Sequence, residues 1–271
     1  MIYAEEIKIS IFAATKHEQK CPMRIISSLE SVGEYALLLK RVLTLPDRFS
    51  QFLKEFLKGV YALGVNSIWI VVIISFFIGA VIVLQIAVNI DSPMLPRFTV
   101  GMVSREIILL EFSSTIMCLI LSGKVGSNIA SELGSMRITE QVDALEIMGV
   151  NSANYLILPK IAAFVAFMPV LVIFSMFMGL FGGYFICLVL GTPSVETYVY
   201  GIQAFFTESF VWYSILKSML FGFIISSVAA FFGYTASGGA LEVGEASTRS
   251  VVMNSILILA TDLVFTQLSM G

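Results

Sequence analysis

The sequence has little charge, one histidine and three cysteines, and each scarcity excludes a class of protein. Asp, Glu, Lys and Arg make up only 13% of the 271 residues, about half of their share in soluble domains. The net charge of -3 provides no basic surface for phosphates, so no nucleic-acid partner is expected. Cys21, Cys118 and Cys187 are an odd set without a CxxC pair. We therefore predict neither a disulfide framework nor a metal site.

The common catalytic motifs are also missing. His17 has no second histidine to pair with, and the chain contains neither HExxH nor GxSxG. Gly123 and Lys124 are followed by Val125, where a phosphate-binding loop would have Ser or Thr. We predict that the chain is not an enzyme, has no cofactor of its own and does not bind ATP by itself.

In place of charge, the chain has long apolar runs. Hydrophobic residues make up 58% of the sequence, and the mean hydropathy is +0.93. The runs approach the ~20 residues that a helix needs to cross a bilayer, whereas a barrel would show alternating segments of about ten. We predict an all-α integral membrane protein with five transmembrane helices, preceded by a cytoplasmic amphipathic interfacial helix. The predicted spans are residues 64–90, 107–121, 155–190, 211–232 and 251–270.

Lysine and arginine indicate the orientation. Nine of them precede the first span, so the positive-inside rule places the N-terminus in the cytoplasm. An odd number of spans then places the C-terminus on the opposite, outer side of the membrane. Arg97 and Arg105 fall on the outer side in this arrangement but are outnumbered. The nine residues are Lys8, Lys16, Lys20, Arg24, Lys40, Arg41, Arg48, Lys54 and Lys58.

The region before the first span divides at Pro46. Residues 24–43 place apolar side chains at i, i+4 and i+7, which predicts a helix lying on a surface, and the pattern recurs after the proline. We interpret residues 23–63 as an interfacial region on the cytoplasmic leaflet; packing on a soluble partner is the alternative. Residues 1–22 lack the pattern and are either a disordered N-terminal extension or residues upstream of a start at Met23.

The polar segment 122–150 is the most informative part of the chain. It places four carboxylates and two cations on one loop between two spans, which favours contact with another molecule in water. We expect a short amphipathic helix inside it, with Thr139 as N-cap, Glu140 in the first turn and Gly149 just after the last turn. An ordinary surface hairpin is the alternative. The charged residues are Lys124, Glu132, Arg137, Glu140, Asp143 and Glu146.

Three charged residues lie inside predicted spans. Glu111, Lys217 and Asp262 fall in the second, fourth and fifth spans, where each charge costs roughly a few kcal/mol unless it is paired or hydrated. We expect them to face a shared interior. Two interpretations stay open. The three residues form a polar floor or gate of a transport cavity, where one lysine cannot neutralise two carboxylates, or they form a structural ion pair between spans four and five.

Small residues mark the third span. Gly179 and Gly183, with Gly182 between them, form a GxxxG spacing that lets another helix approach closely. The partner helix belongs either to the same chain or to a second copy, and the sequence favours neither.

Several motifs together resemble one protein family. The segment 122–150 contains GKVGS and ASELGSMRITEQVDALEIMG, and further matches are KSMLFG around Lys217, GYTASGG, ASTRSVV and LATDLVF. From about residue 24 to the end, the chain is similar to the MlaE/YrbE family, the permease subunits of MCE-type ABC lipid transporters. The resemblance implies a permease domain over residues 64–271, with segment 122–150 as its cytoplasmic coupling segment.

The resemblance also implies an assembly. The expected partners are a second copy in a homodimer, ABC ATPase subunits docked from the cytoplasm, an MCE-domain protein on the outer side of the bacterial inner membrane, and a STAS-domain accessory protein. The expected cargo is lipid, usually phospholipid, with Glu111, Lys217 and Asp262 as polar residues of its cavity. The expected ATPase-coupling residues are Arg137, Thr139, Glu140, Gln141, Asp143, Leu145, Glu146 and Gly149.

Span two departs from the family pattern in two places. Leu110 and Phe112 replace the Arg and Leu that flank the family's glutamate, here Glu111. Ser113-Ser114 replaces a Gly-Pro pair. Details of helix shape and pocket chemistry are therefore expected to differ in this span.

A proton-coupled secondary transporter of an amphiphile is the alternative function. Such a protein would also place carboxylates such as Glu111 and Asp262 in the membrane. It usually contains an internal repeat, however, and the five predicted spans show none.

Overall fold

The computed structural model describes residues 20–44, 49–90, 96–191 and 193–270, with the backbone alone for residues 20–29, 269 and 270. The secondary structure of these residues is helical, without a strand among them. The chain divides into two compact units, Met1–Thr44 and Leu45–Gly271, and each is described by itself. The disordered extension predicted for residues 1–22 falls almost entirely outside the described residues.

The described part of the first unit is one helix, α2 (Lys20–Val42). The helix predicted over residues 24–43 is therefore confirmed, while its position on a membrane stays a prediction. Val32 and Leu43, on the predicted apolar stripe, are 64% and 61% exposed. Burying such side chains in a bilayer or on a partner would be favourable.

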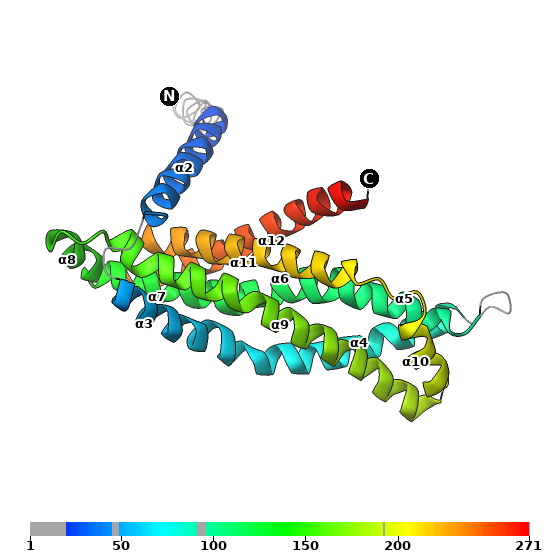
Figure 1. Ribbon diagram of the computed structural model, residues 1–271. Coiled ribbons are helices and arrows are strands. Elements are labelled where there is room, and N and C mark those ends of the chain that lie inside the picture. The colour runs from blue at the N-terminus through cyan, green and yellow to red at the C-terminus, as the bar shows by residue number, and fades with distance from the viewer. Residues whose placement is uncertain (1–19, 45–48, 91–95, 192, 271) are drawn as a thin grey trace, which may run out of the picture. The chain divides into compact units, whose positions relative to one another are not determined.

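The second unit is a helical bundle with five helices long and apolar enough to cross a membrane, which confirms the predicted number of spans (Figure 1). The first spanning helix comprises α3 (Phe49–Gly59), η1 (Val60–Gly64), η2 (Val65–Ser67) and α4 (Ile68–Asn89). The second comprises α5 (Thr99–Ile107), η3 (Ile108–Ile116), α6 (Met117–Leu121), η4 (Ser122–Gly126) and α7 (Ser127–Ile138). The others are α9 (Ser152–Leu190), α11 (Ser209–Tyr234) and α12 (Ala240–Met270).

Two short helices join the spans. The helix α8 (Gln141–Ile147) follows α7, and α10 (Val195–Gln203) precedes α11. They lie at opposite ends of the bundle (Figure 1). The amphipathic piece predicted after Pro46 corresponds to α3, which continues directly into the first span.

The first two spanning helices contain π-helical segments. These are η1 in the first helix and η3 and η4 in the second. Such wider turns interrupt the regular hydrogen-bond ladder and are frequent at functional sites. Lys124 Nζ, in η4, donates a hydrogen bond to the Asn66 carbonyl in η2. The irregular parts of the two helices are therefore joined to each other.

Glycines bring α4 and α9 into close contact. A Cβ on Gly79 would collide with the backbone of Gly179, and one on Gly182 would collide with the backbone of Phe76. A side chain on Gly183 would displace Tyr198 of α10. The GxxxG spacing of the third span thus serves packing within one chain, the first of the two alternatives left open above.

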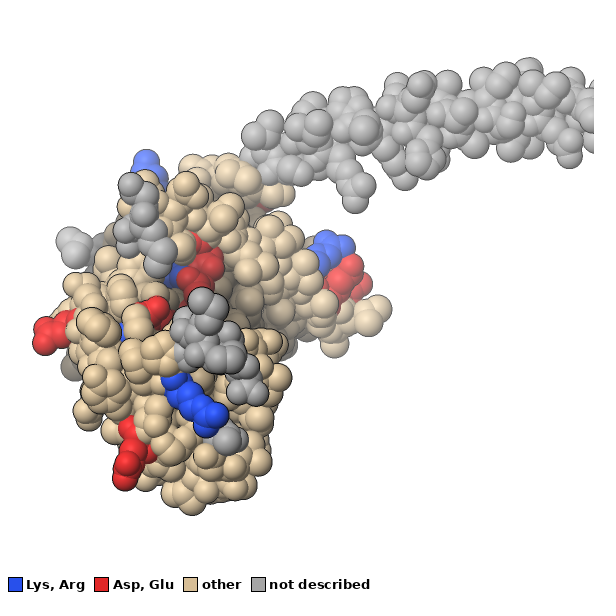
Figure 2. Space-filling view, turned by 90° about the vertical axis from the view of Figure 1, so that its right-hand side faces the viewer, with Lys and Arg blue, Asp and Glu red and all other residues tan. Residues whose placement is uncertain are grey.

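Arg105, one of the two basic residues on the predicted outer side, has a structural role. Its side chain is fully buried in α5, and its Nη1 atom donates to the carbonyls of Ile202 and Ala204 at 2.8 Å. The guanidinium also forms an ion pair with Glu106 at 3.3 Å. Arg105 therefore caps the C-terminal end of α10, where a cation is favourable. Figure 2 views the bundle from this end, where charged side chains are few and scattered.

Candidate functional site

The segment 122–150 is mostly helix, so its interpretation as one internal loop is wrong. Through η4 and α7 the second spanning helix continues to Ile138, and α8 follows after two residues. Ile129 and Leu133 are fully buried where α7 packs against α11 and α12. This apolar burial keeps a polar sequence helical, and the helix carries α8 to the end of the bundle.

The start of α8 also differs from the prediction. Thr139 is not its N-cap: the Thr139 hydroxyl donates to the Ser135 carbonyl at 2.7 Å and so closes α7. Glu140 takes the N-cap position with a φ of 60° and no side-chain capping bond. Gln141 Nε2 donates to the Thr139 hydroxyl at 3.1 Å. A backbone reversal between two helices therefore replaces the expected cap.

One side of α8 is anchored and the other is free. Val142 is fully buried, and Asp143 forms an ion pair with Arg137 of α7. Leu145 is half-buried. Ile147 and Met148, in contrast, are 87% and 68% exposed. The apolar side chains of α8 are therefore buried at its start and exposed at its end.

Glu146 fastens the end of α8 to two spanning helices. Its Oε1 atom accepts hydrogen bonds from the Ser152 hydroxyl at 2.9 Å and from the Tyr234 hydroxyl at 3.1 Å. Gly149 follows the last turn with a φ of 76°, as predicted from its position. A displacement of α8 would therefore act on the ends of both α9 and α11.

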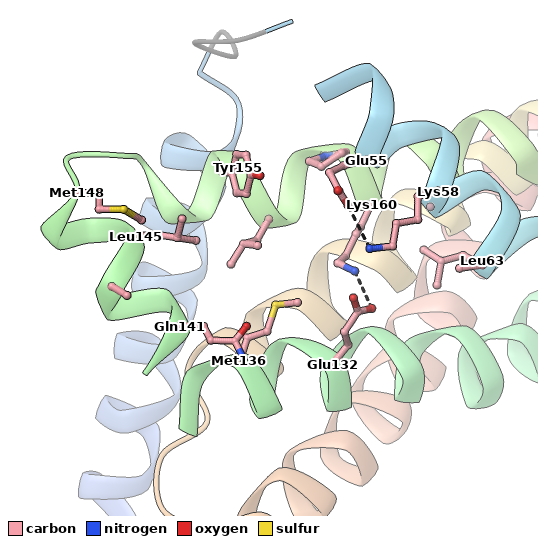
Figure 3. A pocket seen from close by; sticks show the side chains of 15 residues that line it. Glu55, Lys58, Leu63, Glu132, Met136, Gln141, Leu145, Met148, Tyr155 and Lys160 are labelled. Carbon is pink, nitrogen blue, oxygen red and sulfur yellow. Dashed lines mark ion pairs between the residues drawn. The ribbon is translucent and has the colours of Figure 1, made fainter. Parts of the chain in front are cut away.

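A pocket of about 420 Å³ lies beside α8, between this helix and α3, α7 and α9 (Figure 3). Leu145, Met148 and Tyr155 line one part of it. Lys160 of α9 and Glu132 of α7 form an ion pair at 2.6 Å in another part. The pocket therefore lies where α8 meets α3, α7 and α9.

The three intramembrane charges predicted from the sequence lie together. Lys217 of α11 is fully buried, forms an ion pair with Asp262 of α12, and places Nζ 3.3 Å from Glu111 Oε1 of η3. The side chains of Asp262 and Glu111 are 17% and 42% exposed. This triad, defined as Glu111, Lys217 and Asp262, holds two carboxylates against one ammonium. The expected shared interior exists, whereas its role stays a prediction.

Two further side chains, which were not predicted, contact the triad. The Thr115 hydroxyl lies 3.0 Å from Asp262 Oδ1 and 3.3 Å from Glu111 Oε2, so its proton can be donated to either carboxylate. The Lys217 ammonium lies 5.5 Å from the centre of the Tyr213 ring. Thr115 is four residues after Glu111 and Tyr213 is four before Lys217, so helical spacing could have identified both.

No group of three His, Cys, Asp or Glu side chains suited to a metal ion occurs among the residues that the structure describes. Of the three cysteines, Cys118 and Cys187 have described side chains, and both are free and buried.

Comparisons with known proteins agree with the geometry. The family model described as "Permease MlaE" matches residues 56–268. A probable ABC transporter permease protein of Rickettsia bellii is 32% identical over 90% of this chain and 94% of its own length. A protein of the same description from Synechocystis is 31% identical over 76% of this chain and 78% of its own length. One from Porphyra purpurea is 31% identical over 80% and 81%. These relatives favour an ABC permease over a secondary transporter.

Proposed function

The chain belongs to the MlaE permease family and is a permease subunit of an ABC transporter, and we propose that its cargo is phospholipid or a related lipid. In this proposal the lipid passes between the bacterial inner membrane and an MCE-domain protein. Separate ABC ATPase subunits drive the transport, with a STAS-domain protein as accessory. The N-terminus is cytoplasmic and the C-terminus periplasmic.

The observation that carries the proposal is the exposure of the triad inside spanning helices. In a single chain surrounded by lipid, the Glu111 carboxylate, 42% exposed, would meet hydrocarbon. That arrangement is unfavourable, because an unsolvated charge in a membrane is expensive. A second copy that encloses the triad in a polar cavity removes this cost. We infer a homodimer whose cavity holds a lipid headgroup near Glu111.

The proposed contact with the ATPase is the open side of α8. Ile147 and Met148 are exposed at the end of the bundle, whereas Asp143 and Glu146 are engaged with neighbouring helices. The apolar side chains therefore supply the contact energy, and the acidic residues hold α8 in place. When the ATPase subunits close on ATP, they displace α8, and Glu146 transmits the displacement to α9 and α11.

The proposal is tested by purifying the tagged chain in mild detergent, with mass spectrometry of bound proteins and lipids and an ATPase assay. An ATPase, an MCE-domain protein and phospholipid are expected to copurify. Substitution Ile147→Glu should release the ATPase, because it places a charge in the apolar contact. Leu241→Glu is the matched control, since Leu241 is 84% exposed on α12, and it should retain the ATPase.

Two outcomes contradict the proposal. If the folded wild-type chain purifies without lipid or ATPase, the transport assignment fails. If lipid and ATPase copurify and Ile147→Glu behaves like Leu241→Glu, the coupling role of α8 fails while the transport assignment stands.

A further inference from the structure

Buried polar atoms without partners lie on the helices that carry the triad or continue from it. Among the described residues, four buried side-chain atoms have no hydrogen-bond partner. Three of them, Ser122 Oγ, Ser214 Oγ and Asn254 Oδ1, belong to η4, α11 and α12, the helices that surround the triad or continue from it. Buried polar groups are nearly always satisfied in folded proteins, and ordered water commonly satisfies them.

Gly126 lies beside the side chains of Ser122 and Asn254. A Cβ at Gly126 would lie 3.1 Å from Asn254 Nδ2 and 3.8 Å from Ser122 Oγ. The Asn254 amide and the Ser122 hydroxyl therefore both approach the Gly126 backbone, where an added methyl group would crowd them. We call this position the Gly126 niche. A buried water requires two or more polar partners and a space of its own size. Ser122 and Asn254, whose side chains meet at Gly126, each carry one unsatisfied atom, which meets the first requirement.

The buried face of α12 is polar along most of its length. Ser247, Ser250, Asn254, Ile258 and Asp262 are spaced by three or four residues, so they lie on one face, and the first four are at most 8% exposed. The Ser247 hydroxyl donates to the Ser127 carbonyl at 3.3 Å. Ile258 is apolar, as is the buried Val243 one turn before Ser247. Such a face is unusual for a spanning helix, whose polar side chains are expensive without partners.

Polar side chains of the second spanning helix continue the same path. Thr115, Cys118 and Ser122 are spaced by three and four residues on η3, α6 and η4. The Thr115 hydroxyl lies 3.0 Å from Asp262 Oδ1, and the buried Cys118 lies between Thr115 and Ser122 along the helix. The path thus passes beside Ile258 and reaches the triad. We call it the polar seam: Thr115, Cys118, Ser122, Ser247, Ser250 and Asn254.

We propose that the polar seam binds ordered water and hydrates the triad from the end of the bundle that carries α8. Ser247 and Ser127 lie at the α7 end of the seam, the Gly126 niche in its middle and Asp262 at the other end. Water in the seam solvates the excess negative charge of the triad while Glu111 faces the proposed lipid cavity. The inference rests on the unsatisfied seam atoms and the geometry of the triad, so it does not depend on which lipid is the cargo.

A dry seam is the competing arrangement. Polar side chains between membrane helices often serve as interhelical hydrogen-bond partners without water. Some seam residues do this, since Asn254 Nδ2 donates to the Ile225 carbonyl at 3.4 Å. Asn254 Oδ1 and Ser122 Oγ distinguish the two arrangements. In a dry seam both atoms stay without a hydrogen-bond partner, whereas in a hydrated seam water supplies one.

The two buried cysteines provide the test. Cys118 lies in the seam, whereas Cys187 lies in an apolar cluster with Val83 and Tyr198, and both are fully buried. The full-length chain, with Cys21→Ser and either Cys187→Ser or Cys118→Ser, is placed in sealed vesicles of known orientation. A small membrane-impermeant methanethiosulfonate reagent is then added to one side at a time. Cys118 should react at least about tenfold faster than Cys187, and from the α8 side.

A pair of glycine variants tests the niche itself. Gly126→Ala fills the space beside Asn254 and should slow the labelling of Cys118 about tenfold. Gly123→Ala, in the same π-helical segment, adds a methyl group where nothing lies within 4 Å, and should leave the rate unchanged. Ser122→Ala, which removes one water ligand without adding bulk, should slow labelling in the same direction as Gly126→Ala.

The proposal is overturned if Cys118 reacts no faster than Cys187, or if it reacts only from the α10 side. It is also overturned if Gly126→Ala and Ser122→Ala both label at the wild-type rate while their melting temperatures match the wild type. None of these results bears on whether lipid or an ATPase copurifies, so failure of the seam and failure of the proposed function are distinguishable.

Discussion

Two lysine-centred clusters of this bundle differ in charge balance and in exposure. Lys160 faces one carboxylate, Glu132, beside the α8 pocket, and their side chains are 17% and 37% exposed. Lys217 faces two carboxylates inside the spanning helices and is itself fully buried. The first cluster is neutral and reached by solvent at one end of the bundle. The second carries an excess negative charge within the membrane-spanning part.

The difference separates two uses of an ion pair. A solvent-exposed pair is screened, and it contributes about 0–1 kcal/mol. A buried pair contributes little net stability when intact, yet removing one partner leaves an uncompensated charge that costs about 3–5 kcal/mol. The triad should therefore respond strongly to any change of charge, and the Lys160 pair should respond weakly. Comparing substitutions at the two sites tests this contrast.

Removing the triad's lysine should have the largest effect. Lys217→Met leaves Asp262 and Glu111 without a cation and should destabilise the fold by about 3–5 kcal/mol. The measurement is thermal unfolding of the purified chain in detergent, supported by the yield of membrane-inserted protein. A triple variant, Lys217→Met with Asp262→Asn and Glu111→Gln, should recover most of the loss. A single variant as stable as the wild type would show that the triad carries no buried charge.

Exchanging the charges should separate stability from transport. Lys217→Asp alone places three carboxylates together, whereas Lys217→Asp with Asp262→Lys restores one cation among them. We expect the double variant to assemble and melt near the wild type but to lose lipid transport, because the ammonium moves from α11 to α12. Reconstituted transport and unfolding are measured on the same preparation. Full recovery of both would identify the triad as a structural ion pair only.

The triad could be predicted from the sequence because the free-energy cost of a charge inside an apolar span does not depend on the rest of the fold. A charge within an apolar run must be paired or hydrated whatever the fold, so Glu111, Lys217 and Asp262 could be assigned to a shared interior. The five spans were predictable for the same reason, since crossing a bilayer requires about 20 apolar residues. Which lysine contact is closer, and how far each carboxylate is exposed, depends on packing between helices.

The α8 region was predictable only in part. Gly149 follows from the backbone conformation that a helix end requires, and its place was confirmed. Thr139 fits an N-cap and a C-terminal turn equally well by residue type, and the packing of Ile129 and Leu133 decided between them by extending α7. The Glu146 contacts with Ser152 and Tyr234 join residues far apart in the chain. A sequence pattern does not contain that information.

Neutralising the excess charge should affect transport more than stability. Glu111→Gln leaves the Lys217 and Asp262 pair balanced, so the free energy of unfolding should change by at most about 1 kcal/mol. Lipid transport should fall about tenfold or more, equivalent to about 1.4 kcal/mol of barrier, because the proposed headgroup contact is lost. Glu106→Gln is the control on the same spanning helix, because Glu106 pairs with Arg105 and not with Lys217. Equal transport by both variants would remove Glu111 from the cargo site.

Changing the pocket lysine should have the smallest effect on stability. Lys160→Met leaves Glu132 unpaired, but its side chain is 37% exposed and can be hydrated, so the loss should be about 1 kcal/mol or less. Exchanging the pair, with Lys160→Glu and Glu132→Lys, should melt within the same margin and keep the ATPase bound, because Ile147 and Met148 supply that contact. A loss from Lys160→Met as large as that from Lys217→Met would mean that the pocket is closed to solvent in the assembled protein. The two clusters would then no longer differ in exposure to solvent, and only the number of carboxylates around each lysine would distinguish them.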